Sequence, residues 1–264
     1  MMESVDLSHL RPLEAAERPI WRRSDLTPKI WHRQDGLVVR DVTPDLDPFV
    51  IQFLARFYVK DEPMNQALKV AEDPLAIGEQ CAIWSKFILN QRVSLVVLKG
   101  DTPGSGLEKV SENNPPEIIG LNLLYVTSKK DPPLPDFGGT LKSEKVKICF
   151  TAFFRTGALA DVFEKYNVDR YLDGSGMYVI PDWRGKGVGR MLLEGRKELC
   201  KALSIPATKS VFTSNQCQQA AQEYGFELLG EQNYTDCLLE NGQLFFPDMD
   251  PGQEKMQLLG MNFN

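Results

Sequence analysis

Residues able to bind an anion concentrate in one short stretch of the sequence, which reads Arg184-Gly185-Lys186-Gly187-Val188-Gly189-Arg190. Glycines allow the backbone to bend tightly and leave N–H groups unshielded at the start of a helix, whose positive end favours an anion. The basic side chains of Arg184, Lys186 and Arg190 add positive charge over the same few residues. The stretch is therefore predicted to hold a phosphate-rich ligand.

Two familiar phosphate-binding loops do not fit this stretch. A P-loop ends in Gly-Lys-Ser/Thr, whereas Lys186 is followed by Gly187, and a dinucleotide-binding loop needs a third glycine where Arg190 stands. Alone, such a turn is more often a simple bend than a binding site. A strand expected before it, at 176–180, and an amphipathic helix expected after it, at 188–203, favour a binding site.

Length and composition are those of a soluble globular chain. The 264 residues are 42% hydrophobic and 25% charged, which fits one large domain better than two small ones. No apolar run approaches the roughly 20 residues of a membrane-spanning helix, and the first thirty residues lack the apolar centre of a signal peptide. We expect a cytoplasmic protein that does not contact a membrane.

Charge and the rarer residue types exclude several kinds of chemistry. With 30 Lys and Arg against 36 Asp and Glu, the net charge of −6 argues against a general nucleic-acid binder. The two histidines, His9 and His32, lie near the N-terminus, which disfavours a histidine-based triad or a histidine-bound metal, so no metal is expected. Five widely spaced cysteines predict reduced thiols.

The elements that must position the turn follow from apolar spacing and from turn residues. Residues 1–36 are expected to form an irregular arm, and residues 37–264 a single α/β domain. Helices are predicted from Thr43 to the break at Asp61-Glu62-Pro63, and at 75–90, 141–166, 188–203 and 216–224. Strands are predicted at 37–42, 93–99, 117–126, 176–180, 209–213 and 226–234, with an edge strand at 255–262.

At this point the sequence resembles the GCN5-related N-acetyltransferases, or GNAT superfamily, whose pyrophosphate loop has the pattern Q/R-x-x-G-x-G/A. Arg184, Gly187 and Gly189 match that pattern. Val179-Ile180-Pro181 is similar to the V-x-P end of the strand before the loop, and Glu223-Tyr224-Gly225-Phe226 is similar to the closing helix and the start of the next strand.

A second match narrows the resemblance to the insect arylalkylamine N-acetyltransferases. Their F-x-x-K-D-E-P-L-N segment resembles Phe57-Tyr58-Val59-Lys60-Asp61-Glu62-Pro63-Met64-Asn65. Leu172-Asp173-Gly174 is similar to the same subfamily. The resemblance implies a GNAT fold with a mixed central sheet flanked by helices, a splayed strand and a glycine-rich phosphate turn.

The resemblance also implies acetyl-CoA as co-substrate. In this family main-chain N–H groups of the splayed strand hold the pantetheine arm and the thioester, which assigns that role to Met177, Tyr178 and Val179. The pyrophosphate would lie on the turn formed by Arg184, Gly185, Lys186, Gly187, Val188, Gly189 and Arg190. Ser214 and Asn215 are expected to contact the pantetheine arm.

Acetyl transfer to an amine needs a base, because an alkylamine with a pKa of about 10 is protonated at neutral pH. The resemblance assigns this role to Glu62, acting through ordered water. An isolated Asp-Glu-Pro would more often cap a turn, and Asp61 is interpreted as structural.

This sequence departs from the family pattern at the strand-helix junction near residue 213. Where many acetyltransferases have a tyrosine acid, it has Ala221, and Thr213 and Cys217 stand where the insect enzymes have two serines. Thr213 and Cys217 are therefore the candidates for a proton relay, and the thiol puts that relay in doubt. A thiolate with a pKa of about 8.5 can leave without a strong acid.

The acceptor is expected to be a small arylalkylamine that attacks acetyl-CoA directly. Its pocket is placed between the first helices, residues 125–137 and residues 141–166. Its ring would contact the aromatic residues Tyr58, Phe150, Phe153 and Phe154. Alternatives are a polyamine, a longer acyl-CoA or a protein N-terminus as substrate, or a non-catalytic acyl-CoA-binding module. Beyond coenzyme A and the amine no partner is predicted, and we expect a monomer.

Overall fold

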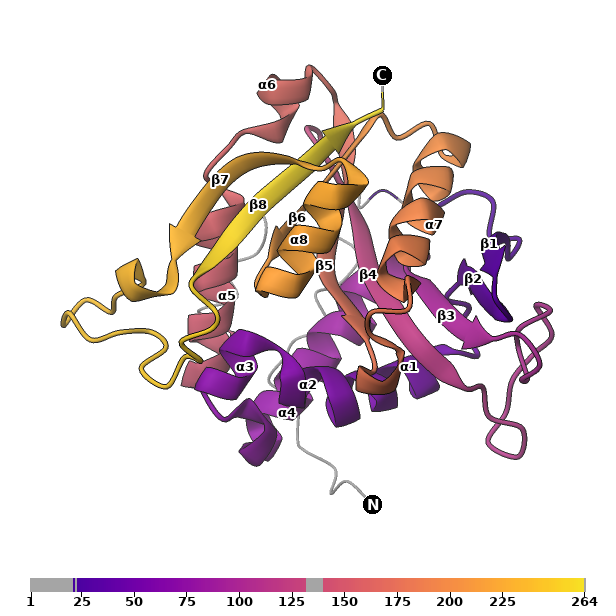
Figure 1. Ribbon diagram of the computed structural model, residues 1–264, viewed down its shortest axis with the longest axis horizontal. Coiled ribbons are helices and arrows are strands. Elements are labelled where there is room, and N and C mark those ends of the chain that lie inside the picture. Colours follow the sequence, from indigo (N-terminus) through magenta and orange to yellow (C-terminus); the bar gives the residue numbers. More distant parts are fainter. Residues whose placement is uncertain (1–20, 22, 132–139, 264) are drawn as a thin grey trace.

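A single mixed β-sheet organises the chain, of which the computed structural model describes residues 21, 23–131 and 140–263. The strands are β1 Ile30–Gln34, β2 Leu37–Asp41, β3 Leu95–Lys99, β4 Ile118–Ser128, β5 Arg170–Val179, β6 Ala207–Phe212, β7 Glu227–Asn233 and β8 Lys255–Asn262. They lie in the order β1-β2-β3-β4-β5-β6-β8-β7 (Figure 1). Only β5 and β6 pair in parallel among these neighbours.

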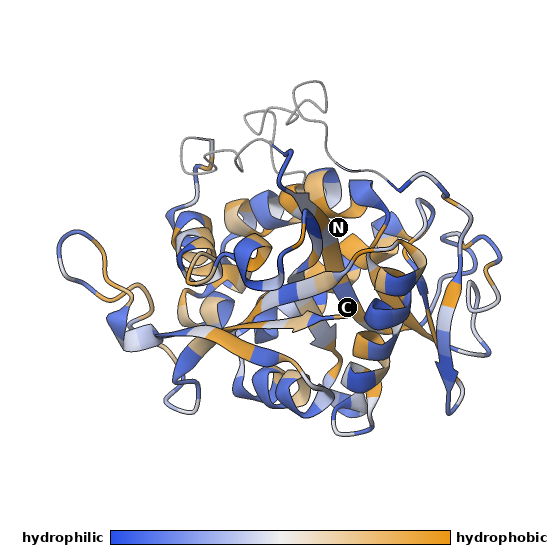
Figure 2. Cartoon of the chain, turned by 90° about the horizontal axis from the view of Figure 1, so that it is seen from above, coloured by the Kyte–Doolittle hydropathy of each residue, from blue (hydrophilic) through white to orange (hydrophobic). Residues whose placement is uncertain are grey.

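Helices cover both faces of this sheet. They are α1 Asp47–Phe53, α2 Val59–Asp61, α3 Pro63–Ala67, α4 Pro74–Ile83, α5 Glu144–Gly157, α6 Val162–Tyr166, α7 Val188–Ala202 and α8 Asn215–Tyr224. Two π-helical turns, η1 Leu54–Tyr58 and η3 Trp84–Ile88, continue α1 and α4. One core lies between the sheet and α7, and another between the sheet and α1 and α4. Figure 2 shows that these helices carry both hydrophilic and apolar residues, as expected for helices packed on one side.

The expected α/β class and mixed sheet are confirmed, and several local expectations are corrected. The arm is not irregular to residue 36, because Ile30–Gln34 pair with β2 as β1; residues 1–20 and 22 lie outside the described residues. Residues 255–262 form a strand, but it lies between β6 and β7, so β7 is the edge. No helix in the described ranges is long and apolar enough to cross a membrane.

Two predicted helix boundaries are wrong, and both lie at the N-terminal ends of helices. The first helix begins at Asp47 after Leu46, and Thr43 does not cap it; the Thr43 hydroxyl instead accepts a hydrogen bond from Arg40. The run 141–166 is two helices, because the Asp161 carboxylate accepts hydrogen bonds from the next turn's N–H groups and starts α6.

The sheet opens between β5 and β6. Their pairing is limited to Leu172–Gly174 with Thr208–Ser210, while β5 continues to Val179 alongside β4. Gly174 is needed at this junction, because a Cβ there would meet the Ser210 hydroxyl and the Arg196 guanidinium. The splayed strand expected from the resemblance is therefore present.

A buried arginine of α7 holds the two strands together where they part. Arg196 is 1% exposed, and its Nε and Nη1 donate to the hydroxyls of Thr208 (2.6 Å) and Ser210 (2.9 Å). Its Nη2 donates to the Leu172 and Lys209 carbonyls. Burial lowers the pKa of the guanidinium to about 10, so it stays charged at neutral pH.

Replacing Arg196 should destabilise the whole domain. Arg196→Met fills much of the volume but leaves the Thr208 and Ser210 hydroxyls and the Lys209 carbonyl without this donor, whereas the Leu172 carbonyl still accepts from the Thr208 hydroxyl. We expect a loss of about 3–5 kcal/mol in the free energy of unfolding. Urea unfolding followed by circular dichroism measures it. Lys201→Met, an exposed change on the same helix, should lose less than about 1 kcal/mol. A similar loss for both variants would contradict the role given to Arg196.

Candidate active site

Glu62 stands where the chain leaves α2 and enters α3. Its backbone is extended (φ −68°, ψ 130°), and Pro63 follows as the first residue of the next helix. Its Oε2 accepts a hydrogen bond from the Asn65 N–H (2.8 Å), as an N-cap. Its Oε1 is buried and has no hydrogen-bond partner among the described residues. One carboxylate oxygen thus fixes the turn, and the other is free to accept a proton.

The surroundings of Glu62 change its acidity. The residue is 5% exposed, and burial raises the pKa of its carboxyl above the ordinary 4.5. The Asn65 N–H, which donates to Oε2, lowers that pKa in part. A carboxylate with a raised pKa is a stronger base than an exposed one, which suits it to take a proton from an amine.

Asp61, one residue earlier, ties this turn to β5 and to the glycine-rich turn. Its Oδ2 accepts hydrogen bonds from the Tyr178 hydroxyl (2.6 Å) and from Arg184 Nη2 (2.7 Å). Arg184 Nε also donates to the Val179 carbonyl (3.0 Å). The guanidinium predicted to hold a pyrophosphate is therefore already engaged with Asp61, and Asp61 is structural as interpreted.

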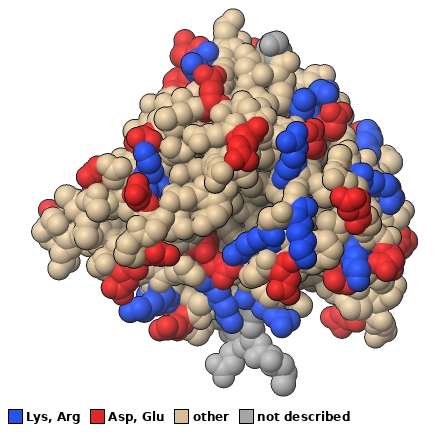
Figure 3. All heavy atoms as spheres, in the orientation of Figure 1, with Lys and Arg blue, Asp and Glu red and all other residues tan. Residues whose placement is uncertain are grey.

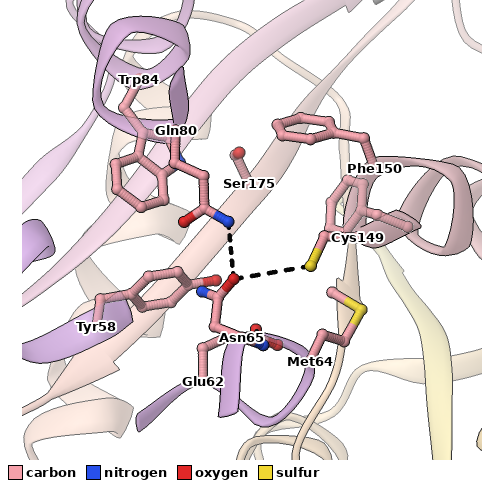
Figure 4. Close-up of a pocket in the computed structure, with 10 residues that line it drawn as sticks. Tyr58, Glu62, Met64, Asn65, Gln80, Trp84, Cys149, Phe150 and Ser175 are labelled. Carbon is pink, nitrogen blue, oxygen red and sulfur yellow. Dashed lines mark hydrogen bonds between the residues drawn. The ribbon is translucent and has the colours of Figure 1, made fainter. Parts of the chain in front are cut away.

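A pocket opens beside Glu62, with a volume of about 420 Å³ including its mouth. Tyr58, Phe150 and Phe153 line it as predicted, whereas Phe154 is absent from its wall and packs on the other two phenylalanines. Residues 132–139, part of the predicted wall, lie outside the described residues. The remaining lining residues are Glu62, Met64, Asn65, Gln80, Trp84, Cys149 and Ser175 (Figure 4).

Sequence reasoning missed most of these additional lining residues. Gln80 and Trp84 are four residues apart, so they share a side of α4 and of the turn that continues it. That spacing was the available signal, but it does not say which side faces a cavity. Ser175 is the extra residue of a β-bulge, since β4 pairs with Gly174 and with Gly176 on either side of it. A bulge commonly redirects a side chain in this way.

A buried carboxylate fixes the pocket wall formed by α4 and α5. Both oxygens of Glu79 accept main-chain hydrogen bonds, from Lys142 (2.8 Å) and Ser143 (3.1 Å), directly before α5. Because the first N–H groups of a helix lack partners within it, this contact joins the two helices firmly. This contact joins α4, which carries Gln80, to the start of α5, which carries Phe150.

The glycine-rich turn has the backbone required to approach a ligand. Gly185 and Gly187 have positive φ (72° and 80°), which side chains rarely tolerate. A Cβ added at Gly185, Gly187 or Gly189 would meet no atom within 4 Å, so the turn faces open space. The helix that begins at Val188 has no side-chain cap, which leaves its first N–H groups for an anion.

Basic side chains surround this turn. Lys186 lies over the Trp183 ring (5.1 Å) and Arg190 over the Tyr224 ring (5.9 Å). Figure 3 shows Lys and Arg side chains gathered beside a hollow in this face of the molecule. The turn and these two cations fit a pyrophosphate. Among the described residues no His, Cys, Asp and Glu cluster is arranged to hold a metal.

The main-chain N–H groups of β5 alternate in direction. The Ile180 N–H donates to the Ile119 carbonyl on the β4 side, so the N–H of Tyr178 also points towards β4. The N–H groups of Met177 and Val179 then face the opening beside β6. Of the three residues predicted to donate main-chain N–H groups, Met177 and Val179 therefore direct theirs into the opening, whereas Tyr178 directs its N–H to β4 and its hydroxyl to Asp61.

The junction between β6 and α8 borders the same opening. Thr213 lies beside Glu62, and its carbonyl accepts a hydrogen bond from the Tyr234 hydroxyl (2.6 Å). The Ser214 hydroxyl caps α8 by accepting from the Cys217 N–H (3.3 Å). Asn215 binds the loop at Gly252 and Gln253 through its side chain and its N–H, so these groups are already used.

Cys217 is close to Glu62 but unsuited to act as a nucleophile. Burial raises the pKa of its thiol above the ordinary 9.0, with a smaller opposing effect from Ser214. The neutral thiol therefore predominates at neutral pH, and the thiol is a far weaker nucleophile than the thiolate. Ala221 is fully buried in the core, so it contributes only packing.

Comparisons with known proteins bear on the class of this fold and site. A scan of protein-family models gives no match, and a search of curated proteins gives none. Among solved structures, arylalkylamine N-acetyltransferase 7 of the yellow fever mosquito Aedes aegypti is 26% identical, with a TM-score of 0.78 over 92% of this chain and 100% of that one.

Two further structures have the same architecture at lower identity. Arylalkylamine N-acetyltransferase 2 of Aedes aegypti is 22% identical, with a TM-score of 0.70 over 87% of this chain and 100% of that one. The polyamine N-acetyltransferase of Drosophila melanogaster, which forms N-acetylagmatine, is 18% identical, with a TM-score of 0.66 over 86% of this chain and 99% of that one.

The fold is therefore that of the GNAT acyltransferases, and the expected enzyme class, an acyltransferase, is confirmed. Within that class, the chain resembles the insect arylalkylamine N-acetyltransferases, as its sequence motifs predicted.

Ionisation of Glu62 should destabilise the folded protein. Because burial raises its pKa in the folded state, its contribution to stability is fully present below the unfolded pKa and is lost as pH rises through the folded pKa. Glu62→Gln keeps an oxygen for the Asn65 N–H and cannot ionise. We expect the free energy of unfolding of this variant, relative to wild type, to increase as the pH rises above the ordinary glutamate pKa of 4.5.

Urea unfolding at several pH values measures this difference. Glu112→Gln, which changes an exposed carboxylate in the loop between β3 and β4, serves as the matched control and should show no such trend. A Glu62→Gln difference independent of pH would show that the carboxyl titrates normally.

Proposed function

We propose that this protein is an N-acetyltransferase that moves the acetyl group of acetyl-CoA to the primary amine of a small arylalkylamine. The observation that carries the proposal is the unpartnered Oε1 of Glu62, buried in a pocket with aromatic walls. The similarity to the mosquito arylalkylamine N-acetyltransferases supports it.

The open end of the sheet suits acetyl-CoA. The glycine-rich turn and the first N–H groups of α7 would hold the pyrophosphate, with Lys186 and Arg190 as neighbouring cations. The N–H groups of Met177 and Val179 would hold the pantetheine arm and stabilise the oxyanion that forms on the thioester carbonyl. Bound in this way, acetyl-CoA would hold its acetyl group between β5 and the pocket.

The reaction then needs one proton transfer before the attack. Glu62 removes a proton from the ammonium, directly or through a water molecule, and the neutral amine nitrogen attacks the acetyl carbonyl. Attack forms the C–N bond and a tetrahedral oxyanion. Its collapse breaks the C–S bond, coenzyme A leaves as a thiolate, and the nitrogen releases its second proton to solvent. With a thiol pKa of about 8.5, that thiolate takes up a proton from solvent, which accommodates the lack of an acid at Ala221.

The pocket favours an aryl amine over a polyamine. Of its described lining residues, Glu62 is the single charged one, whereas Tyr58, Trp84, Phe150 and Phe153 present rings. A polyamine carries a second cation, which would need a second acid. A polyamine remains the alternative acceptor because the Drosophila polyamine enzyme shares the fold. A cytoplasmic location and a monomeric state remain predictions.

Glu62→Gln should abolish most of the activity. Free coenzyme A thiol is measured with acetyl-CoA against a panel of aryl amines, agmatine and short peptides. We expect aryl amines to be acetylated and kcat/KM at pH 7 to fall about 10²–10⁴-fold in the variant, since general-base catalysis contributes that much. Activity should partly recover at higher pH, because the neutral fraction of the amine increases as the pH approaches the amine's pKa of about 10.

Other results of this experiment would change the assignment. Glu112→Gln should leave the rates unchanged. An unaffected Glu62→Gln variant would remove that residue from the mechanism. Tight acetyl-CoA binding without turnover of any amine would favour a non-catalytic acyl-CoA-binding module.

Direct attack predicts that Cys217 never carries the acetyl group. Its buried, protonated thiol is a poor nucleophile, so intact-protein mass spectrometry after incubation with acetyl-CoA alone should show no acetylated Cys217. Initial rates should show a ternary complex, and Cys217→Ala should keep turnover within about tenfold of wild type. Parallel initial-rate lines together with acetylated Cys217 would establish a covalent route.

A further inference from the structure

Two buried oxygens of the pocket lack a hydrogen-bond partner among the described residues. One is Glu62 Oε1, assigned above to the amine, and the other is Gln80 Oε1. Gln80 is 4% exposed and lines the pocket. Buried polar atoms are nearly always hydrogen-bonded in proteins, so this acceptor requires a donor that the described residues do not supply, and a ligand in the pocket can supply it.

The orientation of the Gln80 carboxamide is fixed by its neighbours. Its Nε2 donates to Asn65 Oδ1 (2.7 Å), which also accepts a weaker contact from the Cys149 thiol (3.7 Å). Because Asn65 Oδ1 accepts this hydrogen bond, the nitrogen of Gln80 faces Asn65 and the oxygen points the other way.

The free oxygen lies at the aromatic part of the pocket. Figure 4 shows the Gln80 carboxamide beside Trp84 and Tyr58, with its nitrogen towards Asn65 and its oxygen directed away from Asn65. These two rings meet edge to face at 5.5 Å. Asn65 separates Gln80 from Glu62, since it binds each of them. Gln80 Oε1 thus lies away from the Glu62 carboxylate, on the side of the pocket formed by the aromatic rings.

We infer that Gln80 determines specificity by accepting a hydrogen bond from a donor on the aromatic portion of the substrate, such as a phenol hydroxyl. This inference rests on the proposed N-acetyltransferase function and narrows its substrate to arylalkylamines with a ring donor. An amine without that donor leaves Gln80 Oε1 buried and unpaired, which is unfavourable.

Three amines of similar size test this inference in the wild-type protein. Tyramine has a ring donor, phenethylamine has none, and 4-methoxyphenethylamine has an acceptor at the same position. We expect kcat/KM for tyramine to exceed that for either other amine by about tenfold or more. Equal values for tyramine and phenethylamine would overturn the inference while leaving the N-acetyltransferase function intact.

The variant Gln80→Met then tests whether Gln80 causes the preference for tyramine over phenethylamine. It should lower kcat/KM for tyramine about tenfold or more and change that for phenethylamine little, so the ratio approaches one. Turnover of phenethylamine by the variant shows that it has folded. Gln66→Met, on the exposed side of α3, is the matched control and should keep the wild-type ratio.

The other outcomes are distinct. An equal loss for both amines would show that Gln80 serves the amine group or the fold, and would overturn its role in reading the ring. A ratio unchanged by Gln80→Met would place the discrimination elsewhere. Failure of the wild type to acetylate any amine would overturn the proposed function, and the inference with it.

Discussion

The parting of β5 from β6 is the constraint on which the rest of the structure depends. Three residue pairs join the strands, and a charged arginine within the core completes their hydrogen bonds. Beyond that junction the backbone N–H groups of Met177 and Val179 have no strand beside them. The opening therefore leaves donors suited to an acyl carbonyl. Arg196 binds both strands at the junction and so limits the opening to the residues beyond it.

Neighbouring acids at the entrance of α3 have opposite surroundings. Asp61 accepts two strong hydrogen bonds, from a tyrosine and an arginine, and these join the turn to β5. Glu62 gives one oxygen to a helix cap and keeps the other unpaired. The hydrogen bonds of Asp61 fix the turn that carries Glu62. The Glu62 carboxylate can therefore keep one oxygen unpaired although it is buried.

Local spacing predicted much of the fold and part of the site. The glycine-rich turn, the helix after it and Glu62 are all defined by residues close in sequence. The partners of Arg184 could not be predicted, because Asp61 lies 123 residues away and the guanidinium can meet phosphate or carboxylate equally well. Gln80 and Trp84 were missed because α4 is apolar and buried on several sides, so its pattern does not reveal which side meets the cavity.

Ser175 shows how small a change in the chain can create such a site. The residues on either side of this bulge keep their faces of the sheet: Leu172 and Met177 point towards α7, and Tyr178 points towards α1. The extra residue therefore bends the strand without exchanging its core side chains. Ser175 directly follows Gly174, the last residue of β5 paired with β6, so the bend of a one-residue insertion coincides with the point where the two strands part.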